Sequence, residues 1–288
     1  MKNEKRWGVN MSKITFLGAG SSVFAKNLLG DCMTVEALQD FEFALFDIDH
    51  ERLKDSESML KNLKKNLKST VHIKAYTDRK EALRGAKYVI NAIQVGGYEP
   101  STVIDFEVPK KYGLRQTIGD TVGIGGIFRN LRTIPVMLDF ARDMEEVCPD
   151  AWFLNYTNPM AVLTGTMLRY TGIKTVGLCH SVQVCADHLL KSLDMPTDDV
   201  QWKIAGINHM AWLLEITRRG KDLYPEIKRR AKEKQKEKHD DMVRFELMLR
   251  FGYYVTESSE HNAEYHPYFI KSQYPELIER FNIPLDEY

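Results

Sequence analysis

Residues 13–21 read KITFLGAGS, a short run of β-forming residues that ends in two glycines and a serine. Glycine lets the backbone turn sharply and approach a phosphate closely, and a helix that starts after such a turn offers unpaired N–H groups to the phosphates. Asp47 ends the next apolar run, where an acid in dinucleotide-binding folds contacts the ribose hydroxyls of NAD. The pattern predicts NAD binding by the following residues: Gly18, Ala19, Gly20, Ser21 and Asp47.

One position departs from the dinucleotide-binding pattern. Val23 stands where GxGxxG would have its third glycine. A tight strand-to-helix turn that binds no ligand is therefore the alternative interpretation.

Apolar runs continue beyond this turn and alternate with helical patterns. The strand candidates are residues 13–17, 43–46, 71–76, 87–93, 151–155 and 175–178. Residues 24–38 and 51–67 have helical spacing. Strands separated by helices favour βαβ units, whose right-handed crossovers place helices on both faces of a parallel sheet. We therefore predict an α/β fold with a Rossmann-like, doubly wound parallel sheet.

The sequence changes in character after residue 192. Residues 200–207 and 212–217 are candidates for antiparallel strands, and residues 224–250 have the period of one long, charged helix. We predict an N-terminal extension (1–10), an NAD-binding Rossmann-like domain (11–197) and an incomplete α+β domain for substrate and metal (198–288). Met11 is the expected natural start.

Composition excludes several classes of protein. The 288 residues carry 40 basic and 40 acidic side chains, so the basic excess of a nucleic-acid-binding protein is absent. No apolar run reaches the ~20 residues of a membrane span, and no secretory h-region is visible. The four cysteines have irregular spacing, which favours free thiols. We expect a cytoplasmic protein with neither nucleic acid nor membrane as a partner.

Polar residues follow several of the predicted strands. Asn91 lies in NAIQVGG, at a strand end that should face the ligand crevice, and is predicted to bind the cofactor; a simple glycine turn is the alternative. Asp120 lies in the glycine-rich QTIGDTVGIGG, where it could orient a neighbouring group or cap a helix. Asn155 and Asn158 lie in NYTNP. Asn158 could bind a sugar hydroxyl, or cap a helix that starts at Pro159.

A cysteine and two histidines form the next group of candidates. Cys179 and His180 follow the last parallel strand candidate, and His209 lies in GINHMAW. A thiolate and an imidazole can hold a divalent cation whose shell is completed by substrate oxygens. A Cys–His nucleophile pair is the competing interpretation. Residues 250–268, rich in tyrosine, acids and histidine, suit a sugar-binding wall or a surface loop.

In their order along the chain, these motifs resemble glycoside hydrolase family 4, the NAD- and Mn-dependent glycosidases. The matching stretches are GAGSSVFAKN, LFDID, NAIQVGG, IGDTVGIGG, NYTNP, GLCHSVQ, GINHMAW and RFGYYVTESSEHNAEYHPYF. The α-galactosidase branch is the most similar. The resemblance implies NAD and Mn²⁺ as cofactors, an α-galactoside or related sugar as substrate, and a homo-oligomer.

The resemblance also implies a mechanism that departs from the two-carboxylate scheme of most glycosidases. NAD takes a hydride from C3 of the sugar, which acidifies the C2 proton. A base removes that proton, the glycosidic oxygen leaves C1, water adds, and NADH returns the hydride. The net reaction is hydrolysis.

Residue roles follow from the same resemblance. Cys179 and His209 match the manganese ligands, and Asn158 matches a substrate-binding asparagine, with Asn155 as a second candidate. Asp120 matches an acid that raises the basicity of the catalytic tyrosine. Tyr254 is the predicted base, with Tyr253 next. His180 stands where another branch has a proton-donating aspartate, so it is the predicted acid.

Three alternatives stay open. The first is an α-galacturonidase of the same family. The second is an NAD dehydrogenase of the lactate/malate type, which has no Cys–His metal pair. The third is an inactive, truncated NAD-binding remnant, because members of the family run considerably longer. The segment after NAIQVGG carries acids, which disfavours a sugar-6-phosphate substrate.

Overall fold

The computed structural model describes residues 11–119 and 121–288, which form two compact units. The first unit holds residues 11–95 and 133–178, and the second holds residues 96–132 and 179–288. The predicted boundary after residue 197 divides the chain once, whereas each of these units consists of two separate segments of the chain. That boundary stays a prediction. The predicted N-terminal extension and Asp120 lie outside the described residues.

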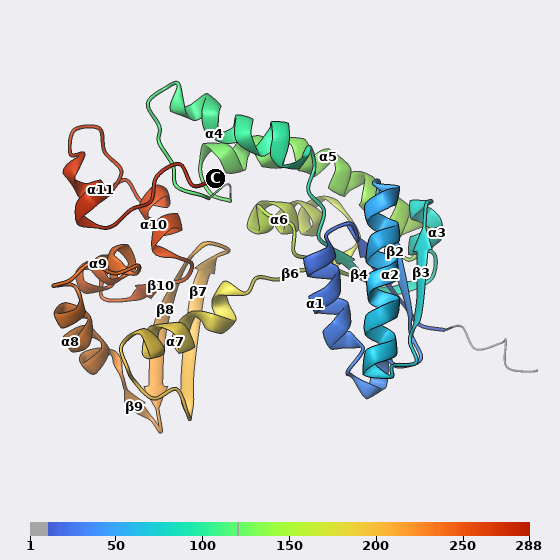
Figure 1. Cartoon of the computed structure of the whole chain (residues 1–288), viewed down its shortest axis with the longest axis horizontal. Helices are drawn as coiled ribbons and strands as arrows, with labels where there is room; N and C mark the ends of the chain where they lie inside the picture. Colours follow the sequence, from blue (N-terminus) through green and yellow to red (C-terminus); the bar gives the residue numbers. More distant parts are fainter. Residues whose placement is uncertain (1–10, 120) are drawn as a thin grey trace, which may run out of the picture. The chain divides into compact units, whose positions relative to one another are not determined.

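A six-stranded parallel sheet forms the centre of the first unit (Figure 1). Its order is β3-β2-β1-β4-β5-β6, in which the direction of winding reverses beside β1. The strands are β1 (Lys13–Leu17), β2 (Glu42–Phe46), β3 (His72–Tyr76), β4 (Ala86–Asn91), β5 (Trp152–Asn155) and β6 (Lys174–Gly177). The predicted Rossmann-like, doubly wound sheet is confirmed.

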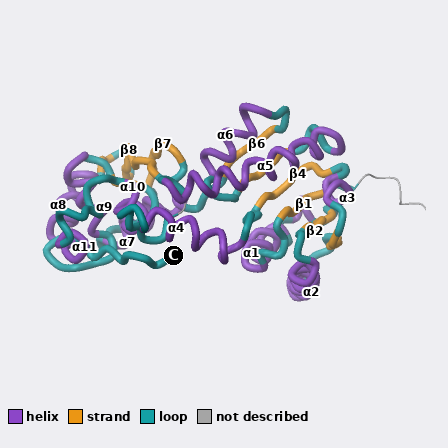
Figure 2. The backbone as a smooth tube through the Cα atoms, turned by 90° about the horizontal axis from the view of Figure 1, so that it is seen from above, coloured by secondary structure: helices purple, strands orange, loops and turns teal. Residues whose placement is uncertain are grey.

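Helices cover both faces of this sheet. Figure 2 shows α1 and α2 on one face, and α5 and α6 on the other. The helical segments are α1 (Ser22–Cys32), η1 (Glu36–Leu38), α2 (His50–Leu67), α3 (Arg79–Leu83), α5 (Ile124–Val147) and α6 (Met160–Tyr170). Helix α5 contributes residues to both units. No helix in the described ranges is long and apolar enough to cross a membrane.

Each face of the parallel sheet buries its own apolar core. Leu29 and Leu60 of α1 and α2 pack with Phe43 of β2 on one side. Met137 of α5 packs with Phe153 of β5 on the other side. Strands covered on both faces need near-continuous apolar residues, which explains the unbroken apolar runs of the sequence.

The parallel strands end in register at one edge. Leu17 pairs with Phe46 and with Asn91, Asn91 pairs with Asn155, and Asn155 pairs with Gly177. The segments that follow these residues therefore all leave from the carboxyl edge of the sheet, where ligands bind in open α/β folds.

The second unit contains a smaller antiparallel sheet of order β10-β8-β7, with β9 paired to β8. Its strands are β7 (Val200–Ile207), β8 (Met210–Arg218), β9 (Lys221–Asp222) and β10 (Tyr254–Val255). The helical segments are η2 (Gly97–Thr102), α4 (Val103–Lys110), α7 (Ser181–Ser192), α8 (Tyr224–Lys234), α9 (Met242–Phe251), α10 (Ser259–Tyr265) and α11 (Glu276–Arg280). The predicted pair of antiparallel strands is confirmed.

The prediction of one long helix over residues 224–250 is wrong. Two helices, α8 and α9, occupy this stretch and are separated at residues 235–241. Asp241 is buried and accepts hydrogen bonds from Arg244 Nε and Ser259 Oγ. Gln235 Nε2 donates to the Met242 carbonyl at 3.0 Å. The charge pattern alone would continue one helix through these residues. The chain leaves the helix here, and the Asp241 side chain is buried and hydrogen-bonded.

Candidate functional site

Two glycines of the turn after β1 leave no free space for a Cβ atom. Gly18 has a φ of +87°, and a Cβ on it would lie 2.7 Å from the Ala92 carbonyl oxygen. A Cβ on Gly20 would lie 2.7 Å from Asp47 Oδ2, because the Gly20 N–H donates to that oxygen at 2.7 Å. The turn therefore brings the backbone, the start of α1 and the Asp47 carboxylate together, as NAD binding requires.

Side-chain amides connect the carboxyl ends of β4 and β5 by hydrogen bonds. Asn91 Nδ2 donates to Asn155 Oδ1 and to Thr157 Oγ1, both at 3.0 Å. Thr157 Oγ1 in turn donates to the Ile93 carbonyl at 3.1 Å. Asn91 and Asn155 are both fully buried. Their positions support a role in fixing the carboxyl edge of the sheet, and they do not support a direct contact between Asn155 and a sugar.

Asn158 occupies a half-buried position just before α6. Pro159 is the N-cap residue of this helix, and no side chain caps it. The alternative prediction, in which Asn158 caps a helix that starts at Pro159, is therefore wrong. A sugar contact through Asn158 stays a prediction.

Three potential metal ligands meet in the second unit. Cys179 Sγ lies 3.8 Å from His209 Nε2 and 3.7 Å from Glu257 Oε1, and His209 Nε2 lies 3.1 Å from Glu257 Oε1. All three ligand atoms lie within 4.8 Å of one another. Metal–ligand bonds of about 2.0–2.3 Å place two ligands of one ion roughly 3–4 Å apart, so one cation fits this spacing. We call Cys179, His209 and Glu257 the metal triad.

The pairing of β10 with β8 explains how this triad forms. His209 occupies the two-residue loop of the β7–β8 hairpin, in which Ile207 pairs with Met210. Antiparallel pairing sets Val255 opposite Trp212, so the chain after β10 runs toward the same loop. Cys179 lies two residues before the start of α7. Three separate elements therefore supply one ligand each.

The backbone is strained at two of the three ligands. His209 has a φ of +146° and Glu257 has a φ of +64°, values that residues other than glycine adopt rarely. Such conformations persist only where the surrounding structure imposes them, and they cluster at functional sites.

The chemistry of the donor set suits a divalent cation. Burial lowers the pKa of His209 to about 4, so the imidazole is neutral near pH 7 and can donate a lone pair. A thiolate and an imidazole favour borderline metals, and the Glu257 carboxylate adds the oxygen ligand that Mn²⁺ prefers. The residues present therefore fit a manganese ion.

Glu257 is a ligand candidate that the sequence analysis did not single out. It lies within the polar-aromatic run 250–268, in which several acids are equivalent by composition. The same run supplies His261 and Tyr265, whose ring centroids lie 5.4 and 6.4 Å from that of His209. The predicted site wall contains Glu257, His261 and Tyr265, but no spacing rule distinguishes these three residues from the other polar residues of the run.

Tyr254, the predicted base, lies elsewhere. It is 0% exposed, and its hydroxyl donates to Asp241 Oδ2 inside the core. Burial raises its pKa well above the ordinary value for tyrosine. A fully buried phenol cannot reach a sugar, so its position does not support this role. Tyr253, the second choice, is exposed; Tyr265 is the tyrosine beside the metal triad.

His180, the predicted acid, is exposed at the N-cap position of α7. Its backbone carbonyl accepts hydrogen bonds from the N–H groups of Gln183 and Val184. It directly follows Cys179 in the chain, and its role as a proton donor stays a prediction.

Two family models match this chain. The family 4 glycosyl hydrolase model matches residues 13–195, and the model of the family's C-terminal domain matches residues 204–288. The chain belongs to the family 4 glycosyl hydrolases. This membership favours the glycosidase over the lactate/malate dehydrogenase alternative.

Known members of the family show the same relationship. An α-galactosidase of Bacillus subtilis is 73% identical over 278 residues, which cover 96% of this chain and 64% of that protein. The crystal structure of LplD, described as a glucosidase of the same organism, is 27% identical, with a TM-score of 0.83 over 96% of this chain and 66% of that one. A 6-phospho-α-glucosidase from gut microorganisms, solved with NAD and Mn²⁺, shares the fold at 22% identity, with a TM-score of 0.74 over 94% and 65%. This family 4 chain thus spans about two thirds of these relatives.

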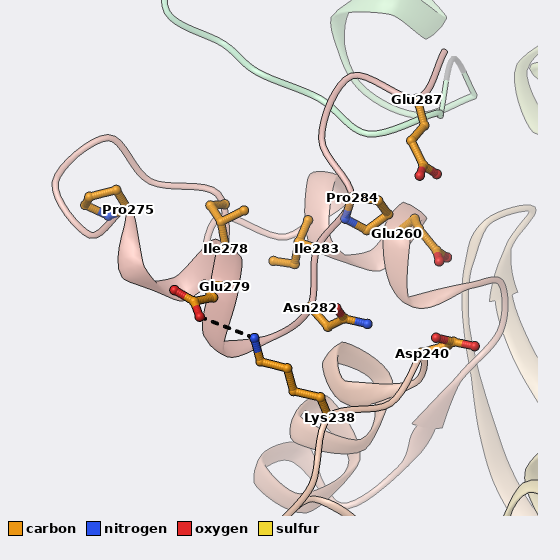
Figure 3. A pocket seen from close by; sticks show the side chains of 10 residues that line it. All are labelled: Lys238, Asp240, Glu260, Pro275, Ile278, Glu279, Asn282, Ile283, Pro284 and Glu287. Atoms are coloured by element: carbon orange, nitrogen blue, oxygen red, sulfur yellow. Dashed lines mark hydrogen bonds and ion pairs between the residues drawn. The ribbon is translucent and has the colours of Figure 1, made fainter.

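A hollow of about 500 Å³ lies elsewhere in the second unit (Figure 3). Lys238 and Glu279 form an ion pair across it at 3.4 Å, while Asp240 and Glu260 add further negative charge. Its lining contains no member of the metal triad, so we assign it no role in the chemistry.

Proposed function

We propose that this chain carries the cofactor turn and the metal triad of an NAD- and Mn²⁺-dependent α-galactosidase. The single observation that carries the proposal is the triad of Cys179, His209 and Glu257 in a family 4 chain. The 73% identity to an α-galactosidase supports the choice of sugar.

Each cofactor has residues suited to it. When bound, NAD would supply a hydride acceptor and donor, and Mn²⁺ would supply a Lewis acid for sugar oxygens. The N–H groups at the start of α1 would hold the pyrophosphate, and the Asp47 carboxylate would accept hydrogen bonds from ribose hydroxyls. Cys179, His209 and Glu257 would hold the metal ion.

Proton transfer needs a base near the triad. Tyr265 meets this requirement better than Tyr254, because its ring lies beside His209, whereas Tyr254 is sealed in the core. Burial raises the pKa of Tyr265, so its phenol would stay protonated near neutral pH and could not accept a proton without positive charge nearby. A dication held by the triad would oppose that effect. Asp120 stays the proposed partner of the base, and His180 the proposed acid.

We propose a neutral sugar in place of a sugar 6-phosphate, because the segment after NAIQVGG carries acids and its nearby arginine is paired. Arg132 forms two hydrogen bonds with the buried Asp105, at 3.1 and 2.6 Å. That guanidinium is therefore already paired with a carboxylate. This pairing supports the choice of a neutral galactoside. We also propose the reducing cytoplasm as the location, because the four cysteines are free thiols.

Hydrolysis of 4-nitrophenyl α-galactoside in deuterated buffer tests the proposal. We expect turnover to require NAD, Mn²⁺ and a thiol reductant together, and the galactose released to carry deuterium at C2. Turnover after removal of both cofactors, or product without deuterium at C2, would overturn it. The matched control is 4-nitrophenyl α-galactoside 6-phosphate, for which we expect no turnover.

A further inference from the structure

The backbone around Glu257 is held by side chains at three consecutive carbonyls. Asn262 Nδ2 donates to the carbonyls of Thr256 and Ser258, both at 2.9 Å. Arg244 Nη1 donates to the carbonyl between them, that of Glu257 itself. These contacts explain why Glu257 keeps its left-handed conformation, which an unconstrained chain would leave.

Arg244 belongs to a buried chain of polar groups that ends at Tyr254. Its Nε pairs with Asp241, and its guanidinium carbon lies 4.7 Å from the centre of the Tyr254 ring. Asp241 also accepts from the Tyr254 hydroxyl and, at 3.2 Å, from Ser259 Oγ. Arg244, Asp241 and Tyr254 are all buried.

A buried ion pair is a weak source of stability, because removing both charges from water costs about as much as their attraction returns. Here the arginine of the ion pair, Arg244, also donates a hydrogen bond to the backbone carbonyl of Glu257, a candidate metal ligand. Groups that orient metal ligands in this way commonly change metal affinity about 10–100-fold when they are altered.

We propose that Tyr254, Asp241 and Arg244 act in series as positioning residues that set the Glu257 carboxylate for metal binding. Tyr254 fixes Asp241, Asp241 fixes the guanidinium, and the guanidinium fixes the Glu257 carbonyl. The inference rests on the proposed function, because it requires a metal at the triad.

The test measures the Kd of Mn²⁺ for the 288-residue chain by electron paramagnetic resonance, without sugar. We expect Tyr254→Phe to weaken binding about 10-fold, and Arg244→Lys by 10-fold or more, because lysine cannot donate to Asp241 and to the Glu257 carbonyl in the same geometry. The Kd for NAD should stay unchanged in both variants.

Tyr224→Phe is the matched control. Tyr224 is another buried phenol of the same core. Its hydroxyl donates to the Leu213 carbonyl and accepts the backbone N–H of Tyr254 at 3.1 Å, so it contacts the backbone of Tyr254 but none of the side chains of the series. Its removal should lower the melting temperature about as much as Tyr254→Phe does, while the Kd for Mn²⁺ stays within about twofold of the starting value. If both phenylalanine variants weakened Mn²⁺ binding equally, the loss of affinity would follow from lower stability alone, and the proposal would be overturned.

A double-mutant cycle shows whether Arg244 acts through Glu257. In a Glu257→Gln background, Arg244→Lys should cause no further loss of Mn²⁺ affinity. Additive losses would overturn the series, as would single variants that fold and bind Mn²⁺ as the unmodified chain does. If the unmodified chain binds no Mn²⁺, the proposed function and this inference both fail; if it binds normally and only the variants contradict us, the proposed function stands.

Discussion

The glycine turn and the metal triad both lie where the chain changes direction, but they are built in different ways. The turn combines a local glycine sequence with one acid from the neighbouring strand, and its contacts are largely to backbone. The triad takes side chains from three elements separated by 30 and 48 positions in sequence, two of them on strained backbone. A site made of backbone is specified locally, whereas a site made of side chains depends on the tertiary structure around it.

The largest expected effect tests whether the triad is one site. Cys179→Ala removes a thiolate ligand, so we expect the Kd for Mn²⁺ to rise more than 100-fold, while the Kd for NAD stays unchanged. Both constants can be measured by calorimetric titration.

Cys185→Ala serves as the control for this substitution. Cys185 is a buried thiol of the second unit that faces the Val255 carbonyl at 3.9 Å and contributes nothing to the triad. It should keep full Mn²⁺ affinity. A Cys179→Ala chain that binds Mn²⁺ within threefold of the original would remove Cys179 from the site.

The next effect tests the glycine turn. In Gly20→Ala the new Cβ would lie 2.7 Å from Asp47 Oδ2, so either the turn or the carboxylate must move. We expect at least a 10-fold loss of NAD affinity, about 1.4 kcal/mol, with no change in Mn²⁺ affinity.

Gly165→Ala is the matched control, because Gly165 lies inside α6 with open space around its Cβ direction. It should leave NAD affinity unchanged and raise stability by about 0.5–1 kcal/mol. Unchanged NAD binding in Gly20→Ala would show that the turn is only a structural connection.

These two sites show what a sequence can predict. The strands and the glycine turn were predictable because an apolar run or a glycine determines the structure of only the few residues around it. Glu257 was not predictable, since only the pairing of β10 with β8 brings it to the His209 loop.

The burial of Tyr254 was not predictable from the sequence for a related reason. Strand β10 has only two residues, Tyr254 and Val255, and both are buried, so it has no alternation of buried and exposed positions that a sequence pattern could show.

A smaller effect concerns Glu264, which links the loop 117–119 to α10. Its carboxylate accepts from the N–H groups of Thr117 and Gly119 at 2.9 and 2.6 Å, and burial raises its pKa to about 7. Between about pH 4.5 and 7, Glu264 is therefore protonated in the folded chain and ionised in the unfolded chain. The free energy of unfolding contributed by this group falls as pH rises through that window.

Glu264→Gln cannot lose a proton, so it should remove this dependence. We expect the stability of the original chain relative to the variant to fall by about 2 kcal/mol between pH 4.5 and 7, measured by urea unfolding. Taking the difference cancels the opposite slope from the histidines, whose pKa values burial lowers. A difference that does not vary with pH would contradict the prediction.

The smallest effect belongs to the hollow outside both sites. Lys238→Ala breaks an exposed ion pair with Glu279, so stability should change by less than about 0.5 kcal/mol. Neither NAD nor Mn²⁺ affinity should respond. A clear change in either affinity would mean that the hollow belongs to the functional chemistry.

The common register of the strand ends has a consequence for protein engineering. One residue inserted into β1, β2, β4 or β5 would push the following segment about 3.3 Å along the strand and turn its side chains to the other face. The strands themselves should therefore tolerate almost no insertions or deletions, while the connections at their amino ends should accept them. Chimeras between members of the family are best joined at the amino ends of these strands.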